Sequence, residues 1–353
     1  MDTTDQQRVS AIIPARNEEA NIARVVRSLA AQGGIREILV LNDQSVDRTA
    51  EILAALEPEI PLLRTISVET LPEGWLGKTH AVAMGAAVAT GDWLLFTDAD
   101  TEHLPGSLSE LLKRAEDERV DLLSVSPGQE TPTWWEKSVI PFVFVKLASL
   151  FSFEDVSDPH SPAAAANGQF LLVRKDVYQR SGGHEAVKSE ILEDVELARR
   201  VKASGGKLLF LPGARWVRTR MYHTFREMWQ GWTKNLYLLY GGNSSKMLAA
   251  VASLWLLDLF PALCFLAVCL WVAFARAGVA LIVTALGLFL LALARQWSYG
   301  RDLGRMGFAP DLASYQPIGA ALLGLLMLSS LRAHRRTGSI EWKGRSYATK
   351  GKE

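Results

Sequence analysis

The chain has 353 residues, of which 38 are basic and 38 acidic, so its formal net charge is zero. This balance argues against nucleic acid as the main partner, because no global positive field exists. The length allows one large α/β domain plus a smaller part, and two cysteines, Cys264 and Cys269, provide neither a disulfide framework nor a zinc pair.

The first ten residues, MDTTDQQRVS, are polar and include two aspartates. They contain no apolar core of the kind that a signal peptide needs. We therefore expect no signal peptide, and a soluble domain that stays in the cytoplasm.

Strands and helices alternate through the first two thirds of the chain. Short apolar runs predict strands at 9–14, 37–43, 61–68, 93–96 and 168–174. Helical spacing of apolar residues predicts helices from Asn21, within 44–56, in 175–180 and in 190–206. Ser45 or Asp47 is expected to cap the second of these helices. The alternation predicts a doubly wound α/β sheet.

Two nucleotide-binding motifs are excluded by their spacing. Gly77-Lys78-Thr79 matches the end of a P-loop, but that motif requires a glycine five residues before Gly77, where Pro72 stands. No G-x-G-x-x-G follows the first predicted strand, which argues against a dinucleotide-binding Rossmann domain.

Two acids, Asp98 and Asp100, directly follow the apolar run 93–96. Carboxylates at the carboxyl end of a buried parallel strand lie where open α/β sheets bind ligands. At about 4 Å two such charges repel by roughly 4 kcal/mol at an effective dielectric near 20. A divalent cation between them and a diphosphate would relieve this repulsion. The alternative is a pair of solvated loop acids.

A second acidic pair, Glu193-Asp194, lies near the amino end of the helix predicted at 190–206. That position favours a carboxylate and leaves backbone N–H groups free to face a ligand. The alternative is that the pair has no catalytic role, because acids are common in the first turn of any helix.

Apolar residues dominate the chain after Lys246. The segments 247–274, 277–294 and 318–331 are candidate membrane spans, the last of them marginal in length. Two crossings and a re-entrant or interfacial third segment would keep the basic tail inside, as the positive-inside rule requires. Asp258 lies within the first span and is expected to face protein or a cavity, not lipid.

Composition thus predicts three regions: a soluble domain at 1–243, transmembrane or interfacial helices at 244–333 and a basic cytoplasmic tail at 334–353. The stretch 131–151, which contains Trp134-Trp135 beside lysines, fits either a core helix or a surface at the membrane interface.

Five segments resemble, in order, the family 2 glycosyltransferases: IIPARNEEANI, ILVLNDQSVDRT, GWLGKTHAVAMGAAVATGDWLLFTDADT, NGQFLLVRKDVYQRSGGHEAV and ILEDVELARRVKASGG. The resemblance covers about residues 9–235. It implies a GT-A fold with a doubly wound mixed sheet, and inverting transfer of a sugar from a nucleotide sugar. GWLGK, RMY, GWTKN and IEWKGRSY resemble the membrane-bound branch that includes hopanoid-associated and carotenoid glycosyltransferases. The Q-x-x-R-W box of the processive synthases is replaced here by Gln230-Gly231-Trp232-Thr233-Lys234.

The resemblance also implies roles for individual residues. Donor-binding positions are expected in the loops that follow the strands, at Pro14, Arg16, Glu18, Asp43, Lys78 and Asp98. Asp98 and Asp100 correspond to the D-x-D motif that binds Mg²⁺ or Mn²⁺. Asp194 corresponds to the general base, and Glu193 is its companion. His103 and His223 are possible third ligands of the metal.

These observations predict an inverting, metal-dependent enzyme that moves one hexose from a nucleotide sugar, UDP-linked, to a hydroxyl of a membrane lipid such as a hopanoid, carotenoid or polyprenol. The protein is expected in the cytoplasmic membrane as a multi-pass protein whose catalytic domain faces the cytoplasm. Two alternatives remain open: a polyprenyl-phosphate glycosyltransferase, whose acceptor is already an anion, and a non-catalytic membrane scaffold with the same fold.

Overall fold

The computed structural model describes residues 8–274, 278–336, 339–342 and 345–348. By internal contacts the chain divides into two compact units. The sheet unit comprises Met1–Glu130 and Leu150–Met221, and the helical unit comprises Thr131–Ser149 and Tyr222–Glu353.

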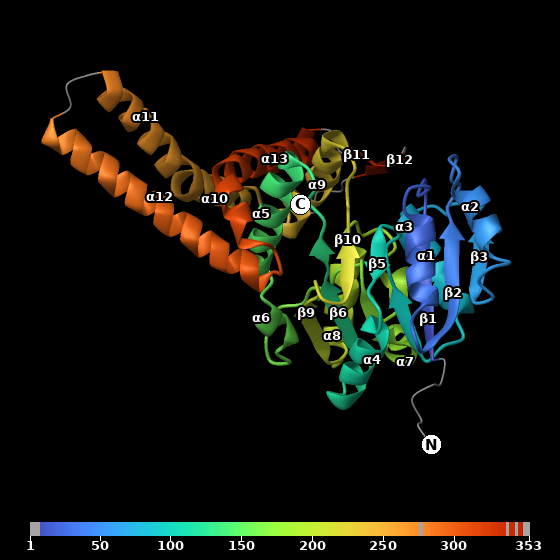
Figure 1. Ribbon diagram of the computed structural model, residues 1–353. Coiled ribbons are helices and arrows are strands. Elements are labelled where there is room, and N and C mark those ends of the chain that lie inside the picture. Colours follow the sequence, from blue (N-terminus) through green and yellow to red (C-terminus); the bar gives the residue numbers. More distant parts are fainter. Residues whose placement is uncertain (1–7, 275–277, 337–338, 343–344, 349–353) are drawn as a thin grey trace. The chain divides into compact units, whose positions relative to one another are not determined.

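The centre of the sheet unit is a mixed sheet in the order β3-β2-β1-β4-β8-β6-β9, which is seven-stranded within the described residues (Figure 1). Its strands are β1 (Val9–Ala15), β2 (Ile35–Asn42), β3 (Leu63–Ser67), β4 (Trp93–Phe96), β6 (Leu122–Ser126), β8 (Leu171–Arg174) and β9 (Leu208–Pro212). β1, β2, β3 and β4 are parallel, whereas β8 runs antiparallel to both β4 and β6. The predicted doubly wound mixed sheet is confirmed.

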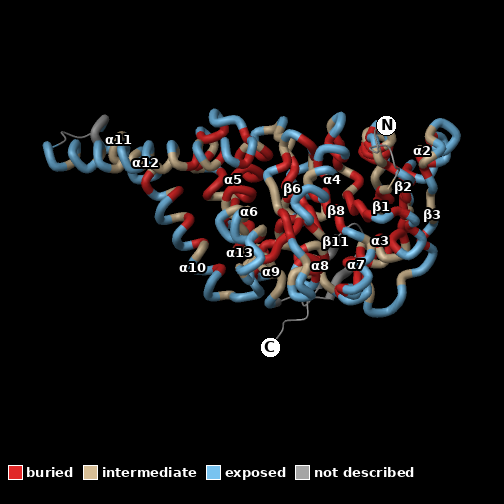
Figure 2. The backbone as a smooth tube through the Cα atoms, turned by 90° about the horizontal axis from the view of Figure 1, so that it is seen from below, coloured by how far each residue is buried: buried red, intermediate tan, exposed pale blue. Residues whose placement is uncertain are grey.

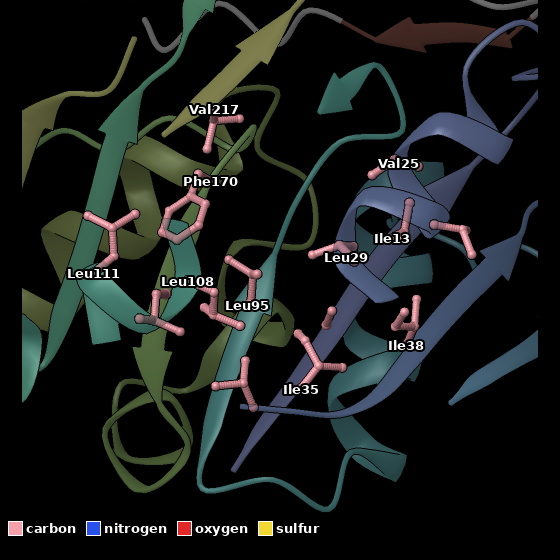
Figure 3. Close-up of a cluster of buried hydrophobic side chains, with 14 of the residues drawn as sticks. Ile13, Val25, Leu29, Ile35, Ile38, Leu95, Leu108, Leu111, Phe170 and Val217 are labelled. Atoms are coloured by element: carbon pink, nitrogen blue, oxygen red, sulfur yellow. The ribbon is translucent and has the colours of Figure 1, made fainter. Parts of the chain in front are cut away.

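Alternate strand residues face opposite sides of this sheet, because side chains of a strand alternate with period two. Ile13, Ile38 and Leu95 lie in a core cluster with α1 (Ile22–Ala30), α2 (Thr49–Leu56) and α4 (Ser107–Asp117), part of which Figure 3 shows. Ile12 and Leu94 lie in a second cluster on the other face. The near-continuous apolar runs of the sequence therefore reflect strands that are buried on both faces.

The second face is covered by α3 (Gly77–Val88), α6 (Phe153–Ser157), α7 (Lys175–Arg180) and α8 (Glu193–Ala203). The small residues of α3 let it approach the sheet closely. A Cβ on Gly85 would lie 2.6 Å from Ile12 Cγ2 and 2.8 Å from Leu41 Cδ2, so the glycine is required by packing. This contact fixes the helix that carries Lys78 over β1 and β2.

A smaller sheet stands beside the carboxyl end of β4. It consists of β5 (Thr101–His103), β10 (Val217–Thr219) and β7 (Gly128–Gln129), with β10 in the centre. The 3-10 helix η2 (Gly183–Val187) connects α7 to the segment before α8.

The helical unit contains long helices and one terminal hairpin. Its elements are α5 (Trp134–Leu150), α9 (Phe225–Leu239), α10 (Ser244–Leu254), the π-helix η3 (Trp255–Leu259), α11 (Phe260–Phe274), α12 (Val279–Arg305), η4 (Pro310–Tyr315), α13 (Gln316–Arg336), β11 (Ser339–Trp342) and β12 (Arg345–Ala348). α13 packs on α9, α10 and η3. A Cβ on Gly324 of α13 would overlap the ring of Trp255, so the glycine makes room for this side chain.

Three helical segments are long and apolar enough to cross a membrane: Ser244–Trp271, Val279–Arg305 and Pro310–Arg335. They confirm the three predicted candidate spans, although the prediction at 277–294 begins on a residue outside the described ranges. Within the most apolar 18 residues of each span, no residue of the second span is buried, whereas half of those of the third span are buried. Figure 2 shows the described residues of α11 and α12 as mostly exposed or intermediate, with few buried ones. This difference favours a lipid-facing α11–α12 pair and a third helix that packs partly on protein.

The predicted boundary at residue 243 falls inside the helical unit, because α5 and α9 pack with the apolar helices. α5 buries Val139, Phe142 and Val143 almost completely, so the core-helix interpretation of 131–151 is confirmed for most of its length. The predicted tail at 334–353 lies partly outside the described residues and otherwise forms the end of α13 and the β11–β12 hairpin.

Candidate active site

The D-x-D acids lie in the turn between β4 and β5. The carbonyl oxygen of Asp98 accepts a hydrogen bond from Thr101 Oγ1 at 2.8 Å, and the carbonyl oxygen of Asp100 accepts one from Arg24 Nη2 at 3.1 Å. These bonds hold the turn by its backbone, so the position of both carboxylates at the carboxyl end of the central strand is fixed.

Lys78 connects this turn to the acids of α8. Its Nζ is 2.8 Å from Asp98 Oδ1 and 2.8 Å from Glu193 Oε1. Removal from water alone would lower the pKa of Lys78, but the charges of Asp98 and Glu193 outweigh it and hold this pKa well above its ordinary value. The lysine is therefore a permanent cation between two acidic segments that are almost a hundred residues apart in sequence.

Asp194, at the start of α8, is held by two backbone donors. Gly168 N–H donates to Oδ2 at 2.8 Å, and Val195 N–H donates to Oδ1 at 2.8 Å. Burial and the neighbouring charge of Glu193 raise the pKa of Asp194 to about 6, against the opposite effect of Lys78 and of the two N–H groups. A carboxylate with this pKa is mostly ionised at neutral pH and is a stronger base than a solvated aspartate.

Gly168 was not predicted from the sequence as a functional residue. A Cβ at this position would lie 3.0 Å from Lys78 Nζ and 3.5 Å from Asp194 Oδ2. The residue thus donates a hydrogen bond to Asp194 and also leaves room for the ammonium group. The available signal was its place at the start of the strand predicted at 168–174, because a glycine in a strand often marks a close approach of another group.

The first two loops at this edge of the sheet are bonded to each other. Arg16 Nη1 donates to the carbonyl oxygen of Asp43 at 2.8 Å, and Asp43 N–H donates to that of Ala15 at 2.8 Å. Glu18 N–H donates to Thr49 Oγ1 at 2.8 Å. Pro14 lies within β1, one residue before its end.

The predicted donor-binding residues therefore share one edge of the sheet. β2, β1 and β4 are adjacent and parallel, so their carboxyl ends point the same way. The Asp43 side chain is buried, which gives it a defined position. The loops of Arg16, Glu18 and Asp43 and the Lys78 cluster are consequently brought to the same end of the fold.

The histidines take structural positions. His103 is buried with its Nε2 3.1 Å from Thr97 Oγ1, and burial lowers its pKa to about 3. His184 is also buried, with Nδ1 3.0 Å from the Tyr178 hydroxyl, and burial together with the charge of Lys78 lowers its pKa to about 3. His223 belongs to the helical unit, where its N–H donates to Glu227 beside the cap of α9.

Asp98 and Asp100 provide a partial ligand set for a divalent cation. No group of three or more His, Cys, Asp or Glu side chains that could hold a metal occurs in the described part of the chain. Mg²⁺ commonly uses one or two carboxylates and completes its shell with substrate phosphates and water. These two acids therefore fit a cation that is shared with a bound diphosphate, not a cage formed by protein alone.

A mixed sheet of this order, a D-x-D turn after its central strand and an acid at the start of the helix beside it define a glycosyltransferase of the GT-A fold. Residues 10–181 match the model of the glycosyl transferase family 2, so this part of the chain is a family 2 glycosyltransferase domain. The family predicted from the ordered motifs is confirmed.

Similar proteins extend the match over nearly the whole chain. A 4,4'-diaponeurosporenoate glycosyltransferase of Staphylococcus aureus strain MRSA252 is 28% identical over 350 residues, which cover 98% of this chain and 89% of that protein. The protein of the same name from strain USA300 is 27% identical with the same coverage. These relatives confirm the predicted similarity to carotenoid glycosyltransferases.

The fold itself is shared with a solved enzyme. The mannosyltransferase PcManGT from Pyrobaculum calidifontis, in complex with GDP-Man and Mn²⁺, has a TM-score of 0.50 and 20% identity, and the match covers 90% of this chain and 87% of that one. At this identity the likeness establishes the fold alone.

Proposed function

We propose that this glycosyltransferase moves one hexose from a UDP-linked sugar to a hydroxyl of a membrane lipid, with inversion at the sugar carbon. The proposal depends on the position of Lys78. Its Nζ lies 2.8 Å from Oδ1 of the D-x-D acid Asp98 and 2.8 Å from Oε1 of Glu193 in α8. A donor diphosphate beside Asp98 and an acceptor beside Asp194 would then share one small region.

Asp194 serves as the general base in this proposal. The acceptor hydroxyl must lose its proton as it attacks the sugar carbon, which is oxocarbenium-like in the transition state. Asp194 is held by the N–H groups of Gly168 and Val195, and its raised pKa suits it to take that proton near neutral pH. Glu193 is occupied by Lys78, so one carboxylate acts and a single displacement inverts the configuration.

Asp98 and Asp100 would hold the divalent metal, Mg²⁺ or Mn²⁺. When bound, this ion supplies Lewis-acid stabilisation of the charge that develops on the departing diphosphate. PcManGT, which shares the fold, was solved with Mn²⁺. The loops of Arg16, Glu18 and Asp43 would hold the nucleotide at the neighbouring strand ends.

The apolar helices would bring the enzyme to a poorly soluble acceptor. Their composition supports a multi-pass protein of the cytoplasmic membrane, with the catalytic domain on the cytoplasmic side, where nucleotide sugars are made. The name of the relatives supports a carotenoid as the acceptor class.

A second candidate is an acceptor that is already an anion. The relatives act on 4,4'-diaponeurosporenoate, a name that denotes a carboxylate, and a polyprenyl phosphate belongs to the same chemical group of acceptors. Such an acceptor has no proton to lose, so its transfer would depend little on Asp194.

Mass spectrometry of lipids from cells that make or lack the protein tests the proposal. We expect a lipid heavier by one hexose only when the protein is present, and NMR of the intact glycolipid should show the inverted configuration at the anomeric carbon. A matched strain that makes Asp194→Asn should lose the product if the acceptor is a hydroxyl. Product formation at the normal rate by this variant would favour the anionic acceptor, and absence of any glycolipid would contradict the transfer to lipid.

A further inference from the structure

A carboxylate lies within the first apolar span of the helical unit. Asp258 belongs to the π-helix η3, and its side chain is only 2% exposed. π-Helical turns are rare and occur often at functional sites. An ionisable residue inside a candidate membrane span is costly unless it has partners, and it commonly marks a site of function.

Three other helices supply the partners of Asp258. Lys146 Nζ of α5 is 3.0 Å from Oδ2, Arg295 Nε of α12 is 3.1 Å from Oδ1, and Gln316 Nε2 of α13 is 3.0 Å from Oδ1. The expectation that Asp258 faces protein is thus confirmed.

The cluster of Lys146, Asp258 and Arg295 carries two positive charges and one negative charge, a net charge of +1. Within the residues that the structure describes, neither cation has a second carboxylate partner. The two basic side chains are 32% and 34% exposed, whereas the carboxylate is buried. The uncompensated positive charge is therefore accessible from outside the helical unit.

The length of the α11–α12 pair places this cluster near one edge of a bilayer. At 1.5 Å per residue, α11 (Phe260–Phe274) rises about 22 Å, and the apolar residues 279–294 of α12 rise about 24 Å. A bilayer hydrocarbon core is about 30 Å thick. Both lengths are shorter than the core, so a pair that enters the core from one side to this depth would leave Asp258 and Arg295 at that edge, at the level of the headgroups.

Aromatic residues agree with this depth. Trp297, two residues beyond Arg295, is 65% exposed, and the guanidinium of Arg301 lies 4.2 Å from its ring centre. Exposed tryptophan beside arginine is typical of the membrane–water interface. The ring of Phe142 packs on the ring of Tyr299, with their centroids 4.9 Å apart, next to the cluster within the helical unit.

We propose that Lys146 and Arg295 form a binding site for the phosphodiester of an anionic lipid headgroup. The planar guanidinium suits two phosphate oxygens, and the flexible ammonium adds a second point charge. Asp258 holds both cations in place and competes with the phosphate for them. The inference rests on insertion of the α11–α12 pair, which is part of the proposed function, and it does not depend on transferase activity.

The test is lipid retention by the purified full-length protein in detergent, measured by native mass spectrometry. The protein is mixed with equal amounts of phosphatidylglycerol and phosphatidylcholine, and the ratio of the two bound lipids is recorded. We expect the wild type to retain phosphatidylglycerol in excess. Lys146→Gln should lower the ratio about fivefold, the fold-change of about 1 kcal/mol per basic residue near an anionic surface.

The control is Lys113→Gln, which removes an exposed basic residue of the sheet unit and should leave the ratio unchanged. The variant Asp258→Asn distinguishes a cluster that binds lipid from one that only stabilises the fold. It removes the competing carboxylate, so the ratio should rise even if the melting temperature falls.

Three results would overturn the inference. They are an equal ratio for the wild type and Lys146→Gln, an unchanged ratio in a folded Asp258→Asn protein, and full displacement of phosphatidylglycerol by an equal concentration of inorganic phosphate. The last result would assign the site to free phosphate. Each result is independent of the glycolipid assay, so failure here leaves the proposed transfer reaction to its own test.

Discussion

Replacement of Asp194 by asparagine should abolish transfer to a hydroxyl acceptor and stabilise the protein at the same time. The substitution removes the base but keeps the size of the side chain. Loss of a general base typically lowers the rate by about 10²- to 10⁴-fold. A residue whose role was only structural would show the opposite pattern, with loss of stability and activity together.

The gain in stability follows from the pKa of Asp194. An increase from 3.8 to about 6 means that ionisation costs the folded state about 3 kcal/mol at neutral pH, at about 1.4 kcal/mol per pH unit. Asparagine avoids this cost, but it cannot accept from both Gly168 and Val195, and the lost hydrogen bond offsets about 1–2 kcal/mol. The net free energy of unfolding should therefore rise by about 1 kcal/mol.

The pH dependence of stability provides a second test of whether Asp194→Asn stabilises the protein. The pKa of Asp194 is higher in the folded than in the unfolded chain, so the folded state binds more protons between about pH 4 and 6. Wild-type stability should fall relative to the variant as the pH rises through this window. Activity should rise through the same window, because the base acts in its ionised form.

The measurement combines thermal unfolding at several pH values with transfer from the nucleotide sugar. Glu196→Gln is the matched control, because Glu196 lies on the same helix but pairs with Arg199 at the surface, and it should change neither property appreciably. An Asp194→Asn protein that is less stable than the wild type at pH 7, or equally active on a hydroxyl acceptor, would refute the reasoning.

Two further substitutions test the surroundings of the site, and a third tests a buried carboxylate of β2. Gly168→Ala should lower activity at least tenfold and shift the pH–rate profile, because the new Cβ would lie 3.0 Å from Lys78 Nζ; an unchanged profile would contradict this role. Asp100→Asn should raise the Mn²⁺ concentration needed for half-maximal activity, and a chelator should abolish wild-type activity reversibly; full activity in the chelator would exclude the metal. Glu37→Gln should cost about 1–3 kcal/mol of stability at pH 7, because Glu37 Oε1 accepts hydrogen bonds from Ser10 and Thr90. These bonds outweigh burial and lower the pKa of Glu37, so the stability they add should disappear as the pH falls through that lowered pKa.

Local patterns predicted five strands of the mixed sheet and the acidic turn, but not β6 or β9. The apolar run 93–96 forms β4 as expected, with Asp98 two residues beyond its end, and Ile22, Val25, Val26 and Leu29 form the buried face of α1. The second helix begins at Thr49 with Arg48 as its N-cap, so the predicted cap at Ser45 or Asp47 is wrong, although Asp47 Oδ1 accepts the Thr49 N–H. Each of these features depends on residues within about one helical turn of each other.

Contacts between distant segments could not be read from the sequence. Gly168 bonds to an acid 26 residues later, and no periodicity marks that pairing. The composition boundary at 243 was placed where hydropathy changes along the chain. Compact units depend instead on what packs together, and the apolar face of α5 packs with helices that follow it by more than a hundred residues.

The balance of charge around Lys78 explains why a cation should accompany the donor. One ammonium group faces three carboxylates, those of Asp98, Glu193 and Asp194, and the charge of Glu193 adds to burial in raising the pKa of Asp194. A diphosphate brought alone to the same edge of the sheet would be repelled by these acids. We infer that a divalent ion shared by Asp98, Asp100 and the diphosphate would reverse that repulsion, while Asp194, on the far side of Lys78, would remain free to take a proton from the acceptor.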